Sequence, residues 1–92
     1  MNARVVKCFN TTGYENMLNP VYGDRRVFMP VCGDDTGARS KAVALANALG
    51  FDAMDAGALN LARYLEPFAM AWIHLAYAQG LGRDLAFTMA RR

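Results

Sequence analysis

The fold is decided by the stretch Val27-Phe28-Met29-Pro30-Val31-Cys32-Gly33-Asp34-Asp35-Thr36, in which an apolar run is followed directly by a helix start. The run over residues 27–32 is typical of a buried strand. An Asp side chain in the next four positions can accept hydrogen bonds from the free amides of a helix N-terminus. Pro30 has no backbone N–H to donate, so we expect this strand at an edge of its sheet or at a bulge.

The helix that follows carries one apolar stripe and a defined end. Its apolar residues recur at helical spacing, and Gly50 is placed to stop the helix. We expect this stripe to face the sheet. Its members are Ala38, Ala42, Leu45, Ala46 and Leu49.

Two further strands flank this unit. Residues 4–9 read as a buried strand, and residues 51–55 as a short one. The turn Asn10-Thr11-Thr12-Gly13 leaves the first strand, and Thr12 could cap a short helix over residues 14–18. The alternation predicts an α/β fold with about three strands in a mixed sheet.

A long helix is expected over residues 59–79, with a kink at Pro67, whose ring would clash with the carbonyl of Arg63. Gly80-Leu81-Gly82 breaks this helix, and residues 83–92 then form either a last helix, which we favour, or a terminal strand. The long helix is apolar on more than one side. One stripe holds Leu65, Phe68, Ala69, Trp72, Leu75 and Ala76, and a second holds Met70, Ile73 and Tyr77.

Length and composition predict a single domain over residues 1–92 that meets a partner. A chain of 92 residues has a thin core, yet 54% of its residues are apolar. The small sheet can cover only one stripe of the long helix. The other should meet a second copy in a twofold dimer, with Trp72 or nearby aromatic residues as anchors.

Several classes of partner and site are disfavoured. No apolar run approaches the roughly 20 residues that span a bilayer. The net charge is only +2, and Arg25-Arg26 and Arg91-Arg92 are isolated pairs, so we expect no nucleic-acid partner. His74 is the single histidine and Asp34-Asp35 reads as a helix cap, so no metal site is expected.

Cysteine usage and the N-terminus indicate a cytoplasmic protein. Cys8 and Cys32 lie in expected strands among apolar residues, which favours reduced core thiols over a disulfide or metal site. No secretory signal precedes the first strand.

The order of several short motifs resembles the C-terminal half of the deazaflavin-dependent NADP oxidoreductase family, over residues 5–87. The motifs are Val5-Val6-Lys7-Cys8-Phe9-Asn10-Thr11, Gly33-Asp34-Asp35, Gly50-Phe51-Asp52-Ala53-Met54-Asp55-Ala56-Gly57-Ala58-Leu59, Ala62-Arg63-Tyr64-Leu65-Glu66-Pro67-Phe68-Ala69-Met70-Ala71-Trp72-Ile73-His74-Leu75-Ala76 and Gly80-Leu81-Gly82-Arg83.

This resemblance implies a partial Rossmann-like fold, a function and a set of site residues. Family members hold NADP through Gly-x-Gly-x-x-Gly in an N-terminal half, and the archetype exchanges hydride with the deazaflavin coenzyme called factor 420. That fingerprint is missing from this sequence, so cofactor binding by this chain alone is not expected. The residues that correspond to the family's acceptor pocket are Phe9, Asn10, Thr11, Thr12, Gly57, Leu59, Asn60 and Ala62.

Hydride transfer between two carriers needs positioning more than acid or base chemistry, so no catalytic side chain is assigned. Simpler readings stay open beside this one. Asn10 and Thr11 can merely satisfy turn amides, Arg63 and Glu66 can form a local ion pair, and Trp72 can be a packing residue.

The leading hypothesis is a truncated or split NADP-linked oxidoreductase domain that helps to form a hydride-acceptor pocket and a dimer interface. If the enzyme is split, its nucleotide-binding half would lie on another chain. The alternative is a noncatalytic dimerisation or interaction module.

Overall fold

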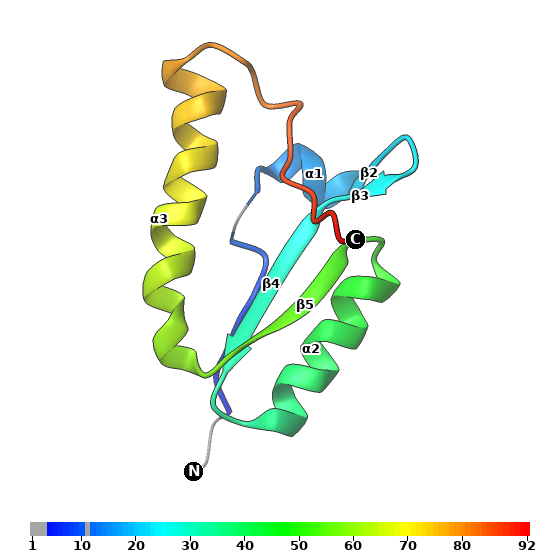
Figure 1. Ribbon diagram of the computed structural model, residues 1–92, viewed down its shortest axis with the longest axis vertical. Helices are drawn as coiled ribbons and strands as arrows, with labels where there is room; N and C mark the ends of the chain where they lie inside the picture. The colour runs from blue at the N-terminus through cyan, green and yellow to red at the C-terminus, as the bar shows by residue number, and fades with distance from the viewer. Residues whose placement is uncertain (1–3, 11) are drawn as a thin grey trace.

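The computed structural model of the chain describes residues 4–10 and 12–92 (Figure 1). Short 3₁₀ and π-helical segments, η1 and η2, flank the long helix α3. The elements in chain order are β1 (Val6–Lys7), α1 (Tyr14–Leu18), β2 (Val21–Tyr22), β3 (Arg25–Arg26), β4 (Phe28–Gly33), α2 (Thr36–Ala48), β5 (Asp52–Gly57), η1 (Leu59–Leu61), α3 (Ala62–Ile73) and η2 (His74–Ala78).

The main sheet has three strands in the order β1-β4-β5. Strand β1 pairs antiparallel with β4, in the register Val6 to Gly33, whereas β4 and β5 run parallel. Strands β2 and β3 form a separate hairpin. The α/β class and the mixed sheet expected from the sequence are therefore confirmed.

The sheet lies between helix α2 on one side and helix α3 on the other (Figure 1). Met29, Phe51 and Ala46 belong to the buried core between the sheet and α2. Both cysteines are free thiols, and burial raises the pKa of the Cys8 thiol. No helix in the described part of the chain is long and apolar enough to cross a bilayer.

The expected edge position of the Pro30 strand is wrong, because β4 is the central strand, but the alternative of a bulge agrees with a register shift between Val31 and Cys32. Alternate residues of a strand direct their backbone groups to opposite sides. On the side away from β5, the Phe28 N–H donates to the Phe87 carbonyl (2.9 Å) and Cys32 pairs with Lys7. Pro30 lies between these two points, beyond the end of the two-residue strand β1, where no donor is required.

Helix α2 begins as expected but buries a different face. The Asp35 carboxylate accepts from the Ala38 N–H (2.7 Å), which confirms the acidic cap. Ala46 is fully buried, whereas Leu45 and Leu49 are 56% and 54% exposed. The predicted stripe is therefore only partly correct, because Val43 packs against the core and the two leucines do not.

The expected cap of helix α1 is also wrong. Gly13 occupies the N-cap position, and no side chain caps the helix. The Thr12 hydroxyl instead accepts a hydrogen bond from the Asn16 side chain (2.5 Å). The side chain of Thr12 is therefore engaged by another side chain rather than by the backbone.

Helix α3 continues through Pro67, and its hydrogen bonding changes from α to π at His74. The inner stripe contains the buried residues Trp72 and Ala76. The second stripe lies in solvent, with Met70, Ile73 and Tyr77 exposed by 59%, 42% and 54%. Trp72 therefore packs within the chain rather than on an open surface, and an anchor formed by a nearby aromatic residue stays a prediction.

The polar residues at the start of α3 do not form the local pair that the spacing allowed. Glu66 forms its ion pair with Lys7 of β1, and Arg63 donates to the hydroxyl of Tyr64 (2.9 Å). The Lys7–Glu66 pair therefore links the long helix to the edge strand.

Neither a helix nor a strand forms over residues 83–92, so the favoured terminal helix is wrong. This segment, here called the C-terminal strap, runs back along the body of the molecule (Figure 1). Phe87 packs between α3 and β4, its ring centroid 4.7 Å from that of Phe68. The strap makes its backbone hydrogen bonds to other elements, which replaces the ladder of a helix.

Candidate functional site

The turn after β1 contains a backbone conformation that is unusual for its residue type. Phe9 has φ of 63°, in the region that favours glycine. Its N–H lies 3.1 Å from the sulfur of Met29, and its ring packs edge-on against Phe51 at 5.7 Å between centroids. The Phe9 side chain thus packs against the hydrophobic core. Its strained backbone sets the direction in which the chain leaves β1.

Asn10 carries buried polar atoms that have no partner. Both the oxygen and the nitrogen of its side-chain amide are buried, and neither is hydrogen-bonded within residues 4–10 and 12–92. An unmatched buried polar group costs about 1–3 kcal/mol. The side chain of Asn10 therefore has unused hydrogen-bonding capacity among the described residues. Thr11, its predicted neighbour in the site, lies outside the described residues.

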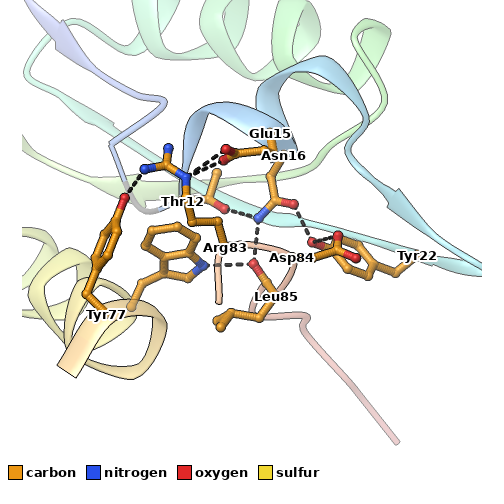
Figure 2. A network of polar contacts seen from close by, with 9 residues as sticks. Thr12, Glu15, Asn16, Tyr22, Tyr77, Arg83, Asp84 and Leu85 are labelled. Carbon is orange, nitrogen blue, oxygen red and sulfur yellow. Dashed lines mark hydrogen bonds and ion pairs between the residues drawn. The ribbon is translucent and has the colours of Figure 1, made fainter. Parts of the chain in front are cut away.

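Thr12 belongs to a polar network that joins distant parts of the chain (Figure 2). Asn16 is 2% exposed, and its amide nitrogen donates to the Thr12 hydroxyl and to the Leu85 carbonyl (2.6 Å). The Tyr22 hydroxyl donates to the Asn16 amide oxygen. The same Leu85 carbonyl also accepts from the indole nitrogen of Trp72 (2.8 Å).

Charged groups continue this network at the surface. The Arg83 guanidinium donates to both oxygens of the Glu15 carboxylate (2.7 and 2.8 Å) and to the Tyr77 hydroxyl. The bond from Arg83 lowers the pKa of Glu15. Burial, and secondarily the charge of Asp84, raises the pKa of Tyr22. The strap is thus joined to α1 and to the end of the long helix (Figure 2).

The second predicted segment follows β5. Gly57 has φ of 107°, and its N–H donates to the Asp55 side chain (2.8 Å). The Leu59 N–H donates to the Asp34 carboxylate (3.0 Å). Asn60 is exposed, and Ala62 is the first residue of α3.

A pocket of about 200 Å³ lies beside this second segment, at the carboxyl end of β4. Leu59 is the predicted site residue that lines it; the other lining residues are Arg4, Val5, Asp34 and Asp35. Arg4 and Asp35 form an ion pair across it at 3.5 Å. Another pocket, of about 230 Å³, contains none of the predicted residues and is lined by Asp24, Arg25, Arg26, Asp52, Thr88 and Met89.

The described residues of the two predicted segments, 9–12 and 57–62, contact different points along β4. Phe9 contacts Met29 near the start of β4, whereas Leu59 bonds Asp34 just after its end. At about 3.3 Å per residue, these two contact points on β4 are roughly 16 Å apart. Helix α3 runs alongside the sheet between these two points (Figure 1).

Sequence reasoning missed the residues that hold the first segment in place. Asn16 and Tyr22 were not singled out, and neither was the carbonyl of Leu85. One signal was available for Asn16, because Thr12 and Asn16 are four positions apart and such polar pairs meet on a helical turn. The Leu85 contact joins positions 69 residues apart, and no local pattern reports it. Among the described residues, no three His, Cys, Asp or Glu side chains form a group that could hold a metal ion.

The chain was compared with known protein families, curated proteins and solved structures. No protein-family model matches the chain. No curated protein matches it either. A solved structure from Arthrobacter sp. FB24, described as a "putative f420 dependent nadp-reductase", superimposes with a TM-score of 0.82 at 33% sequence identity. The match covers 97% of this chain and 40% of that one. In sequence and in fold, this chain is therefore similar over almost its whole length to part of a protein described as an NADP reductase.

Proposed function

We propose that this chain forms the acceptor-side part of an NADP-linked reductase and helps to line the pocket that holds the hydride acceptor. The observation that carries the proposal is the similarity to the Arthrobacter protein, at 33% identity over 97% of this chain. A deazaflavin coenzyme is the acceptor that the description of that protein suggests. The role of the protein groups here is to bind and orient, because the cofactors themselves supply the hydride chemistry.

The unpartnered amide of Asn10 supports a ligand-facing role for the first segment. A buried carboxamide without partners is costly, and a bound molecule with both donor and acceptor groups would remove that cost. Thr12 lies in the same turn with its hydroxyl held by Asn16. The segment that includes Gly57, Leu59, Asn60 and Ala62 would form a separate wall of the site.

The nicotinamide cofactor would be held mainly by another part of the functional enzyme. Dinucleotides bind where a glycine-rich turn presents amides at a helix N-terminus, and this sequence contains no Gly-x-Gly-x-x-Gly. We therefore propose that NADP is bound by a nucleotide-binding half, on the same or another polypeptide. Completion of the site requires that half.

A chimera tests this proposal. The region of the Arthrobacter protein that matches this chain is replaced by residues 1–92, and NADPH-dependent reduction of factor 420 is followed by absorbance. We expect hydride transfer in the chimera and a loss of at least tenfold in kcat/KM for the Asn10→Ala variant. The matched control is Asn19→Ala, which removes an exposed amide at the end of α1. A folded chimera without activity would refute the proposed role.

A second role is favoured by a separate observation. Met70, Ile73 and Tyr77 leave an apolar face on the long helix in solvent. Such a face suits an interface with a second copy of the chain, in which equivalent patches meet around a twofold axis. We propose that the chain forms a homodimer through this face, whether or not it also lines an acceptor pocket.

A further inference from the structure

We infer that Asn16 is a positioning residue that presents the Thr12 hydroxyl as a hydrogen-bond donor to a carbonyl group of the hydride acceptor. This inference rests on the proposed function, because Thr12 belongs to the turn assigned to the acceptor pocket. It adds a residue outside the predicted site and a chemical requirement on the ligand.

The orientation of the Asn16 carboxamide is fixed by its neighbours. The Leu85 carbonyl can only accept, so the amide nitrogen of Asn16 must face it, at 2.6 Å. The Tyr22 hydroxyl donates to the amide oxygen on the opposite side. A rotated carboxamide would place its oxygen against the Leu85 carbonyl, which can only accept, and the bond to Leu85 would be lost. The arrangement therefore has one allowed orientation (Figure 2).

This orientation determines what Thr12 can do. The second N–H of the Asn16 amide is directed at the Thr12 oxygen, which therefore accepts. A hydroxyl that accepts from a neighbour keeps its own proton to donate elsewhere. Within the described residues, the Thr12 hydroxyl donates no hydrogen bond, and Thr12 is only half-buried. A ligand with a carbonyl oxygen at this position would complete the network.

The network also fixes the long helix relative to the turn. The Leu85 carbonyl binds Asn16 and Trp72 together, and the Trp72 ring lies directly against Gly13. Asn16 thus connects the turn after β1, the C-terminal strap and α3 through one buried side chain. A substitution of Asn16 should therefore alter the order of all of these segments, not only that of α1.

Substitutions in the active chimera test the donor role. Thr12→Val removes the hydroxyl at nearly constant shape, and we expect KM for the deazaflavin to rise about tenfold with KM for NADPH unchanged. Thr12→Ser should restore the parental value. Tyr22→Phe removes one of the bonds that hold the Asn16 carboxamide in place and should raise the same KM about threefold, whereas Tyr14→Phe, at an exposed ring, should not. Equal effects on both KM values, or no effect of Thr12→Val, would overturn the inference.

A measurement on the chain itself separates this inference from the proposed function. Amide hydrogen exchange is compared for the parent, Tyr22→Phe and Tyr14→Phe. We expect Tyr22→Phe to speed exchange severalfold both in residues 9–13 and in residues 83–87, with a shift in emission from Trp72, the single tryptophan. An inactive chimera would reject the proposed function alone. Faster exchange confined to α1 would reject the positioning role of Asn16.

Discussion

At the residue scale, two glycines allow the backbone to approach the long helix closely. Gly13 has an ordinary backbone conformation, with φ of −82°, so its requirement is one of space. A Cβ atom at Gly13 would lie 2.9 Å from Cζ2 of Trp72 and even closer to the edge of the ring. Gly57 differs, because its φ of 107° excludes other residues whatever the space.

Gly13→Ala should destabilise the folded chain by about 2 kcal/mol or more, because the new methyl group displaces the buried Trp72 ring. The measurement is the free energy of unfolding in urea, followed by Trp72 fluorescence. The control is Gly37→Ala in α2, where the nearest atom lies 3.4 Å from the new Cβ. That variant should be more stable by about 0.5 kcal/mol, since alanine favours helix. A neutral Gly13→Ala would contradict the close packing of Trp72.

At the scale of elements, α3 and the strap depend on each other. The helix touches the body through Trp72 and Phe68, and both residues also contact the strap. The strap has no ladder of its own, so its order comes from those contacts and from Arg83. A helix and an irregular segment therefore form one packing unit.

Pro67→Ala should stabilise the chain by about 2 kcal/mol. Pro67 lies inside α3 and is exposed, so the substitution restores a donor to the Arg63 carbonyl and removes a clash without disturbing the core. Thermal unfolding measures the change. Ala71→Gly at another exposed position of the same helix should lower stability by about 1 kcal/mol, which shows that the transition reports on α3. An unstable Pro67→Ala would mean that the proline has a packing role.

The ion pair of the strap should make part of the stability depend on pH. Because the pKa of Glu15 is lowered in the folded chain, the pair stabilises the fold at neutral pH and is lost as the pH falls through that lowered pKa. Glu15→Gln should lower the melting temperature at pH 7, and the difference from the parent should vanish in acid, well below about pH 4. Asp24→Asn, at an exposed turn, is the control. A difference that persists in strong acid would exclude the Arg83–Glu15 pair as its cause.

At the scale of the whole molecule, the apolar residues exceed what one small sheet can cover. The described chain leaves large hydrophobic side chains in solvent on both outer helices, among them Ile73 of α3 and Leu45 of α2. The two outer strands of the main sheet, β1 and β5, each have one strand neighbour. Both features suit a unit that meets further protein surface.

The parent chain should sediment as a dimer at micromolar concentrations, and Ile73→Lys should convert it to a monomer. A lysine at the centre of the exposed α3 stripe would place a charge in the proposed interface, where burial without a partner is costly. Leu45→Lys on α2 is the matched control and should leave the dimer intact. A parent that is monomeric at high micromolar concentration would remove this interface.

The chain alone should bind NADPH weakly or not detectably in calorimetry. The physical reason is that its sequence offers no glycine-rich turn to a pyrophosphate. The chimera that carries a nucleotide-binding half is the positive control. Micromolar binding by the isolated chain would show that a dinucleotide site exists elsewhere in this fold.

Much of the architecture followed from local patterns. The strand over residues 28–33, the Asp35 cap and the long helix each depend on neighbours within a few residues, and all of them formed. Pro30 suggested an edge strand because proline has no N–H to donate to a neighbouring strand. The missing N–H is tolerated in the central strand β4, because β1 ends before it reaches Pro30. The residues of the candidate site could be named from a resemblance, but their separation along β4 could not.

The sequence by itself determined the α/β class, the order of the three main strands and the two longer helices, the apolar surplus and the absence of a dinucleotide fingerprint. Tertiary structure alone decided that Asn16 and Trp72 share the Leu85 carbonyl, that the Asn10 amide has no partner among the described residues and that residues 83–92 form a strap. The physical reason is the sequence separation over which each interaction acts. Helix caps and apolar periods act between residues close in the chain, whereas the Asn16–Leu85 bond exists only after the sheet and α3 have brought distant segments together.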